Sequence, residues 1–181
     1  MPVRNVILIG YRGAGKTNVG RAVAARLGWD FVDTDERIEA GGRSIRQIFE
    51  QEGEPFFRQI EAAVIADVTR GTKQVLAVGG GAVCSEPNRA TLRTAGLCIW
   101  LKTPAEELHR RLLTDPRSPA TRPALTPLGG LDEIRHLLKE REPLYAATAH
   151  HVVPTAGQSV EQVVEAVLSV VAAWRASSEA S

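Results

Sequence analysis

Residues 6–17 read V-I-L-I-G-Y-R-G-A-G-K-T, an apolar run that leads directly into a glycine-rich segment. Residues 10–17 match the pattern G-x-x-x-x-G-K-[ST] at every fixed position, and helical spacing follows them. In a strand–loop–helix setting, this pattern forms a loop whose backbone N–H groups point at a phosphate chain. The dinucleotide pattern G-x-G-x-x-G fails, because its third glycine would fall on Asn18. The segment therefore predicts a site for a nucleoside triphosphate.

Each part of this loop has a physical role in holding a nucleotide. The glycines let the chain turn tightly, and the helix that follows adds its positive N-terminal end. Lys16 would reach the β- and γ-phosphates, and the hydroxyl of Thr17 would ligate Mg²⁺. The alternative is a glycine-rich turn that carries a Lys-Thr pair by chance, and the complete match in this setting disfavours it. The predicted nucleotide contacts are Gly13, Ala14, Gly15, Lys16 and Thr17.

Composition excludes several other classes of protein. The chain has 181 residues and a formal net charge of +1, which indicates one domain and no bias toward nucleic acid or membrane surfaces. No apolar stretch is long enough to span a bilayer, and the first predicted strand leaves no room for a signal peptide. Cys84 and Cys98 stand alone, as in reduced cytosolic proteins. We therefore expect a single-domain cytoplasmic protein.

Short apolar runs alternate with amphipathic segments, which is typical of a parallel sheet covered by helices. The apolar runs predict five strands, at residues 5–9, 29–33, 74–78, 97–101 and 150–153. Helices are expected at residues 16–27, 44–49 and 54–69, and two more are expected to begin with caps at Thr103 and Ser159. We expect one domain over residues 1–175, followed by a flexible tail at 176–181.

Residues 114–130 interrupt this alternation with four prolines and a Gly-Gly pair. A connection of this length is usually either a functional lid or a disordered segment. Its position after the fourth strand–helix unit favours a lid, at about residues 114–128.

Two acids end the second predicted strand, in the sequence F-V-D-T-D. If the chain stays extended, Asp33 and Asp35 share a face at the same sheet edge as the phosphate loop. One acid would then hold Mg²⁺ through water, and the other would accept a proton from a substrate hydroxyl. The alternative is that one of them caps a helix starting near Glu36. Beside a phosphate loop, the catalytic interpretation is favoured.

Two more features each have a functional and a structural interpretation. Arg58 follows two phenylalanines, where it either grips a carboxylate with two hydrogen bonds or covers apolar surface with its stem. Residues 79–81 are three glycines at the end of a strand, which indicates a close approach to the main chain or a wide turn. His150 and His151 are interpreted as structural, because no carboxylate or cysteine is spaced to complete a metal site.

Together these segments resemble the shikimate kinase family over nearly the whole chain. The resemblance implies a three-layer α/β/α P-loop fold, as in nucleoside monophosphate kinases. It also implies a five-stranded parallel sheet of order 2-3-1-4-5, an acceptor-binding region at about residues 33–61, and a mobile lid. In chain order, the segments that carry the resemblance are G-Y-R-G-A-G-K-T, D-T-D at 33–35, G-R-S-I-R-Q-I-F from Gly42, F-F-R ending at Arg58, G-G-G-A-V from Gly79, R-P at Arg122-Pro123 and R-E-P-L-Y at 141–145.

The resemblance further implies the reaction. The γ-phosphoryl group of ATP would pass to the 3-hydroxyl of shikimate, with Mg²⁺, on the route to chorismate and the aromatic amino acids. Asp35 would bind the ring hydroxyls and help to accept the proton. Lys16 and the lid residue Arg122 would bind ATP and neutralise charge on the transferred group. Thr17 and, through water, Asp33 would hold the Mg²⁺.

The same resemblance implies how the acceptor is held. Arg58 and Arg141 would bind the carboxylate of shikimate, and Glu61 would support Arg58 from one helical turn away. The backbone of Gly80 and Gly81 would contact the ring. This set suits a small anion that bears three hydroxyl groups, because it offers cations for the carboxylate and an acceptor for a hydroxyl proton.

The chain departs from the family pattern near the adenine. Its lid is longer and richer in proline than in short-lid members, so that Arg110 and Arg111 are both candidates to stack on the base. Arg117 is a further candidate for nucleotide binding. The last predicted strand leads into V-P-T rather than an acidic residue, so we expect backbone groups to recognise the adenine.

Two other functions compete with this one. A gluconate kinase or a nucleoside monophosphate kinase would share the fold, but Arg58, the three glycines and Arg141 argue against both. A kinase-like binding module without turnover would be expected to lose charge at the reacting centre, whereas Lys16, Asp35 and Arg122 are present. We therefore expect a monomeric enzyme whose partners are ATP and shikimate.

Overall fold

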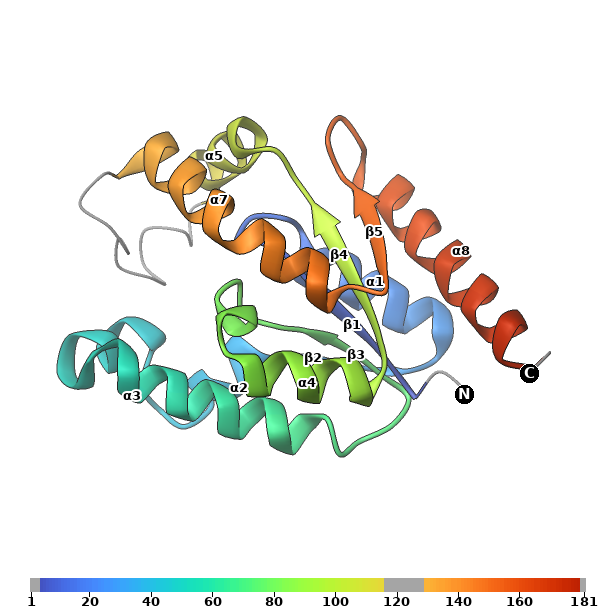
Figure 1. The fold of residues 1–181 in the computed structure, drawn as a ribbon, viewed down its shortest axis with the longest axis horizontal. Helices are drawn as coiled ribbons and strands as arrows, with labels where there is room; N and C mark the ends of the chain where they lie inside the picture. The colour runs from blue at the N-terminus through green and yellow to red at the C-terminus, as the bar shows by residue number, and fades with distance from the viewer. Residues whose placement is uncertain (1–3, 116–128, 180–181) are drawn as a thin grey trace.

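The computed structural model describes residues 4–115 and 129–179 (Figure 1). The predicted lid lies outside the described residues except for its first two, Thr114 and Asp115. Arg117 and Arg122 also lie outside them, so their assignments stay predictions.

A five-stranded parallel sheet forms the middle of the molecule, with the order β2-β3-β1-β4-β5. This confirms the predicted strands and their order, and each strand boundary lies within one residue of its prediction. The strands are β1 (Asn5–Ile9), β2 (Asp30–Asp33), β3 (Gln74–Ala77), β4 (Leu97–Lys102) and β5 (His151–Pro154).

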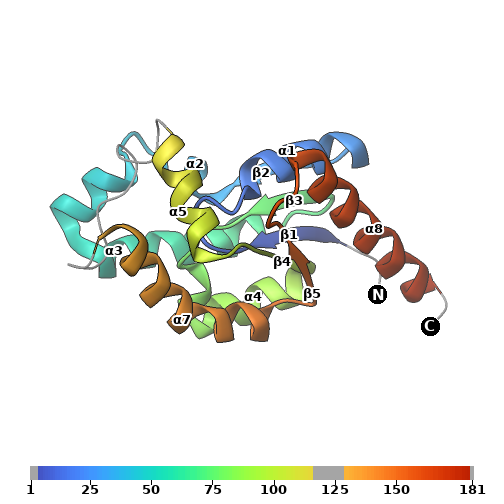
Figure 2. The ribbon, with the colours of Figure 1, turned by 90° about the horizontal axis from the view of Figure 1, so that it is seen from above.

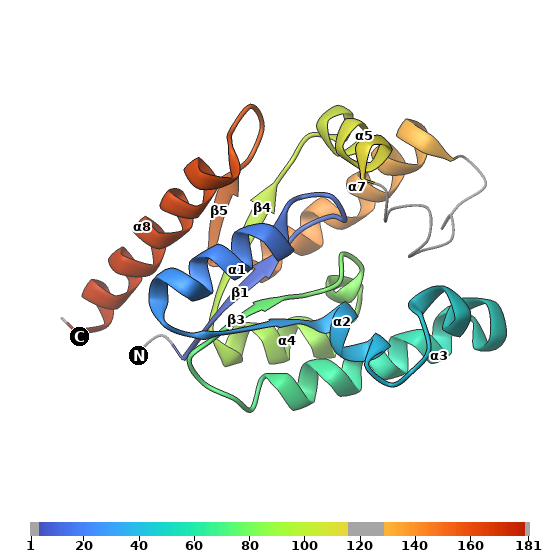
Figure 3. The same cartoon turned by 180° about the vertical axis from the view of Figure 1, so that it is seen from behind.

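Helices cover both faces of the sheet and complete a three-layer fold (Figures 2 and 3). Helices α1 and α8 lie side by side on one face, and α3, α4 and α7 cover the other. The helices are α1 (Lys16–Leu27), α2 (Thr34–Glu39), α3 (Ile45–Val68), α4 (Glu86–Ala95), α5 (Ala105–Thr114), α7 (Gly130–Thr148) and α8 (Val160–Glu179), with a short 3₁₀ turn, η1, at Ala82–Cys84.

The central strand β1 is buried on both faces. Val6 and Leu8 pack into the core beneath α1 and α8, whereas Ile7 and Ile9 pack into the core beneath α3 and α4. All four side chains are fully buried. A strand covered on both sides needs apolar residues at every position, which explains the unbroken run before the phosphate loop.

Helix α3 joins two segments that the sequence predicts as separate helices. Its backbone leaves helical geometry at Gly53, where φ is 83° and ψ is 173°. Pro55 follows this kink and starts the second segment, where its missing N–H costs little. The first segment begins with the predicted capping box of Ser44 and Gln47.

Three features of the helices differ from the expectations. Pro104, rather than Thr103, precedes α5, because the hydroxyl of Thr103 hydrogen-bonds that of Thr155 at 2.6 Å. Helices α4 and α7 were not among the predicted segments; Ser85 caps α4 by accepting from the N–H of Asn88. Helix α8 continues to Glu179, so that residues 176–179 of the expected tail are helical. Within the described ranges, none of the helices has both the length and the apolar character that crossing a membrane requires.

His150 connects the start of β5 to the neighbouring strand. Its ring Nδ1 accepts a hydrogen bond from the backbone N–H of Cys98 at 3.0 Å. The backbone N–H of His150 donates to the carbonyl of Cys98 at 2.8 Å. The ring also packs edge-on against Trp174. Burial lowers the pKa of His150, and the positive charge of Arg93 lowers it further. The structural interpretation of His150 agrees with these contacts.

We expect His150 to make folding stability fall in mild acid. Because its folded-state pKa lies below the ordinary value of 6.5, its contribution is complete above that value. That contribution is lost as the pH falls from 6.5 through the folded-state pKa, because the unfolded chain then binds more protons. His150→Asn keeps an acceptor near Nδ1 but does not titrate. Its melting temperature should therefore change less than that of the wild type between about pH 7.5 and about pH 5.5.

The matched control is His151→Asn, which alters the exposed neighbouring residue. This variant should keep the pH dependence of the wild type. If His150→Asn and the wild type lose the same stability on acidification, the hydrogen bond to Cys98 is not the titrating contact.

Candidate active site

The loops at the carboxyl ends of the strands enclose a cleft of about 840 Å³. This is the edge at which ligands bind in open α/β sheets. Arg58, Gly81 and Arg141 are not part of the lining, but they lie in the layer directly behind it, as the contacts below describe. The predicted site residues that the cleft does bring together are Gly13, Ala14, Gly15, Lys16, Thr17, Asp33, Asp35 and Gly80.

The phosphate loop has the backbone that its glycines predict. Gly10, Gly13 and Gly15 all have positive φ angles, of 144°, 81° and 95°. A Cβ atom on Gly10 would also lie 2.7 Å from the carbonyl oxygen of Leu101 on β4. Lys16 folds over this loop, and its Nζ donates to the carbonyls of Gly10 and Tyr11 at 2.7 and 2.9 Å. The ammonium group therefore lies at the centre of the loop.

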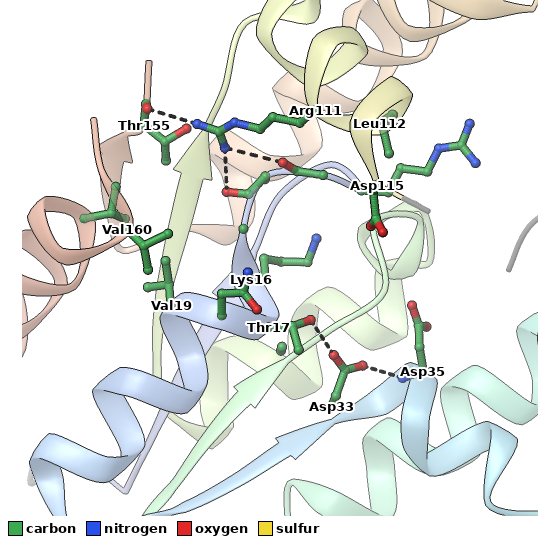
Figure 4. Close-up of a pocket in the computed structure, with 18 of the residues that line it drawn as sticks. Lys16, Thr17, Val19, Asp33, Asp35, Arg111, Leu112, Asp115, Thr155 and Val160 are labelled. Atoms are coloured by element: carbon green, nitrogen blue, oxygen red, sulfur yellow. Dashed lines mark hydrogen bonds between the residues drawn. The ribbon is translucent and has the colours of Figure 1, made fainter. Parts of the chain in front are cut away.

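Asp33 makes two hydrogen bonds, and one of them is the helix cap that the sequence left open as an alternative. Its Oδ2 accepts from the hydroxyl of Thr17 at 2.7 Å, and its Oδ1 accepts from the N–H of Asp35 at 2.9 Å (Figure 4). The second bond caps α2, which begins at Thr34. The expectation that the chain stays extended through Asp35 is therefore wrong, because the cap bends it into a helix. Asp35 still lines the cleft, from the first turn of α2.

Thr34, between the two acids, was missed by the sequence reasoning. Its side chain is fully buried, and its Oγ1 accepts a hydrogen bond from the N–H of Gly79 at 3.1 Å. This bond fastens the end of β2 to the glycine turn after β3. The sequence signal for it is a hydroxyl residue between two acids, which is too common to be diagnostic.

Arg58 lies behind the glycine turn, held by two acids of its own helix. Its Nη1 donates to Glu61 at 2.7 Å, and its Nη2 donates to Glu54 at 2.9 Å. Glu61 is fully buried, so the predicted support of Arg58 by Glu61 is present. Burial acts to lower the pKa of the guanidinium, but the charge and hydrogen bond of Glu61, with those of Glu54, raise it on balance. Arg58 therefore stays protonated, and its two ion pairs hold the guanidinium in position.

The close approach that the three glycines indicate is made by this arginine. A Cβ atom on Gly81 would lie 2.5 Å from Nη2 of Arg58, and one on Gly80 would lie 3.1 Å from the backbone nitrogen of Arg12. The glycine turn is thus packed between α3 and the phosphate loop. A larger residue at Gly81 would displace the guanidinium.

Helix α7 approaches the same turn from the other side. The hydroxyl of Tyr145 donates to the carbonyl of Gly80 at 2.5 Å. Arg141, one turn earlier on α7, is 8% exposed, and its Cζ lies 5.8 Å from the centre of the Tyr11 ring. Arg58 therefore lies against the glycine turn, whereas Arg141, from a different helix, lies over Tyr11 of the phosphate loop.

Arg111 forms the wall of the cleft on the side of β5. Its Nη1 is 3.4 Å from the carbonyls of both Gly13 and Ala14, and its Nη2 donates to the carbonyl of Thr155 at 3.3 Å (Figure 4). Arg110 also lines the cleft, but its side chain is 67% exposed. The two candidates for the adenine side therefore differ: Arg111 is bound to the protein backbone, and Arg110 faces solvent.

We compared the chain with known proteins. Its site combines a phosphate loop, Asp33 bonded to Thr17, and two buried or partly buried arginines. Residues 12–172 match the sequence model of the shikimate kinase family. A shikimate kinase of Symbiobacterium thermophilum is 42% identical over 165 residues, which cover 91% of this chain and 94% of the relative. One of Thiobacillus denitrificans is 46% identical over 157 residues, covering 86% of this chain and 84% of the relative.

Solved structures agree with the sequence relatives. A shikimate kinase from Acinetobacter baumannii, solved in complex with shikimate, superposes with a TM-score of 0.88 at 37% identity, covering 94% of each chain. A gluconokinase from Sinorhizobium meliloti superposes with a TM-score of 0.58 at 17% identity, covering 96% of this chain and 94% of the gluconokinase. The latter likeness extends to the fold alone.

Proposed function

Because this chain belongs to the shikimate kinase family, we propose that its cleft transfers the γ-phosphoryl group of ATP to the 3-hydroxyl group of shikimate. The products are ADP and shikimate 3-phosphate. One observation carries the proposal: a complete phosphate loop and Asp35 line one cleft, in a chain that matches the family over residues 12–172. The loop would present the donor, and the opposite wall would present the acceptor.

The residues that bind the acceptor are assigned by matching their charges to that of shikimate. Shikimate is a carboxylate with three hydroxyl groups, so its anion needs cations in a desolvated place. Arg58 and Arg141 supply two: Arg58 packs against Gly81, and Arg141 lies over the ring of Tyr11 in the phosphate loop. Gly80 lines the cleft, and its backbone and that of the adjacent Gly81 would contact the ring. Asp35 lines the cleft and accepts from a hydroxyl group of the acceptor, taking its proton as transfer proceeds.

The donor side is assigned from the phosphate loop. Phosphoryl transfer needs little covalent help, so these residues act by alignment and by neutralising charge. Lys16 at the centre of the loop faces the β- and γ-phosphates. Thr17 and Asp33 offer a hydroxyl and a carboxylate oxygen 2.7 Å apart, a hard-oxygen set that fits Mg²⁺. When bound there with ATP, Mg²⁺ supplies further positive charge at the phosphates.

The remaining assignments stay within the same proposal. Arg122, in the lid at about residues 114–128, would close over the transferred group and help to exclude water. The absence of a membrane-spanning helix in the described part of the chain is compatible with a cytoplasmic location. The protein is proposed to act as a monomer.

An assay of ADP release tests the function. Purified protein with saturating ATP and Mg²⁺ should release ADP only when shikimate is added. Gluconate and nucleoside monophosphates, assayed in parallel, should not replace shikimate. If shikimate gives no ADP release while another acceptor does, the acceptor is wrongly assigned; if none does, the transfer activity is absent.

Asp35→Asn should abolish most turnover. The amide cannot accept the hydroxyl proton, so kcat should fall by roughly 10²- to 10⁴-fold. The dissociation constant for ATP should stay within about twofold, because Asp35 is assigned to the acceptor. Asp30→Asn is the matched control, since Asp30 is an exposed acid at the start of β2, the strand before α2, and lies outside the cleft lining. An equal loss of ATP affinity in Asp35→Asn would place Asp35 on the donor side instead.

Arg58→Ala should weaken shikimate far more than ATP. Losing a charged hydrogen-bond partner should raise the KM for shikimate by roughly 10- to 100-fold. The matched control is Arg46→Ala on the same helix, whose exposed side chain pairs with Glu50. Similar KM changes for both substrates would contradict the carboxylate role of Arg58.

A further inference from the structure

A cluster of charged and aromatic side chains lies where the phosphate loop meets α7. Tyr11 and Arg12 occupy the first two of the four variable positions after Gly10, and both contact this helix. Nη2 of Arg12 lies 3.5 Å from Oε1 of Glu133, and the guanidinium of Arg141 lies over the ring of Tyr11. The fixed positions of the phosphate-loop pattern do not account for these contacts.

Glu133 is the unusual member of this cluster. Its side chain is only 3% exposed, whereas that of Arg12 is 27% exposed. A buried carboxylate is costly to keep ionised unless it is paired, and a buried pair adds little net stability over an apolar replacement. The best-attested use of such pairs is to fix the register of two elements. The two elements here are the phosphate loop and α7.

Arg12 is also where the donor and acceptor sides touch. Its side chain lines the cleft, and its backbone nitrogen is so near Gly80 that a Cβ atom there would lie 3.1 Å away. Gly80 is in turn bound to α7 through the hydroxyl of Tyr145. A shift of the Arg12 backbone would therefore change the spacing between the phosphate loop and the glycine turn.

We propose that Glu133 is a positioning residue for phosphoryl transfer, which holds the Arg12 guanidinium to α7 and so fixes the phosphate loop relative to the glycine turn. This inference rests on the proposed function. Phosphoryl transfer requires the attacking oxygen, the phosphorus and the leaving oxygen to lie in line. A displacement of about 1 Å is enough to slow such a reaction by roughly 10²-fold. Glu133 acts on the reaction through Arg12 and does not touch substrate.

The experiment is a double-mutant cycle of Glu133→Gln and Arg12→Ala, assayed by shikimate-dependent ADP release. Glu133→Gln should lower kcat about tenfold or more while both KM values change by less than about threefold, because alignment matters only during transfer. If Glu133 acts through Arg12, the double variant should be no slower than Arg12→Ala alone. Glu133→Asp keeps the charge and should recover part of the lost kcat.

Asp132→Asn is the matched control, because it removes an exposed carboxylate one residue away on α7. It should keep the wild-type kcat. The melting temperature of every variant is measured, so that all assays are run on folded protein. The inference is overturned if Glu133→Gln lowers only the melting temperature, or if the two substitutions multiply in kcat. An unmodified protein that does not phosphorylate shikimate would overturn the proposed function, and this inference with it.

Discussion

The burial of β1 on both faces is the constraint on which the rest of the structure depends. Its side chains pack alternately into two cores, and its backbone pairs with β3 on one side and β4 on the other. All five strands run parallel, so their carboxyl ends meet at one edge of the sheet. The phosphate loop, Asp33 and the glycine turn come from three adjacent strands of that edge. Their proximity follows from the strand order.

Much of this arrangement could be predicted from local patterns. The five strands, the phosphate loop and the capping box at Ser44 depend on neighbouring residues, which the sequence displays directly. The pair of Arg58 and Glu61 was also predictable, because residues three apart on a helix share a face. Here the family resemblance added the acceptor, a carboxylate, which no local pattern could name. The fold, the phosphate loop and the pair of Arg58 and Glu61 could therefore be predicted from the sequence.

Other features depend on contacts between distant segments and were missed for that reason. Thr103 has the sequence context of a helix cap, yet its hydroxyl pairs with that of Thr155, which arrives from the end of another strand. Asp33 caps α2, as the alternative interpretation expected, and it also accepts from Thr17, a contact between separate segments that no local pattern displays. Glu133 resembles any first-turn acid of a helix until Arg12 is seen beside it. Helix α4 was missed although Ser85 and Pro87 are ordinary signals of a helix start.

Arg111 has a consequence for the polarity of the phosphate loop. Its Nη1 lies 3.4 Å from the carbonyl oxygens of both Gly13 and Ala14. A carbonyl held by a cation fixes the direction of its peptide dipole. The amide of the Gly13–Ala14 peptide donates to the carbonyl of Tyr11 at 3.2 Å, so this part of the loop is held by internal bonds before any anion arrives. To that extent the loop is ordered by folding and not by the ligand, so less free energy is lost in ordering it when phosphate binds.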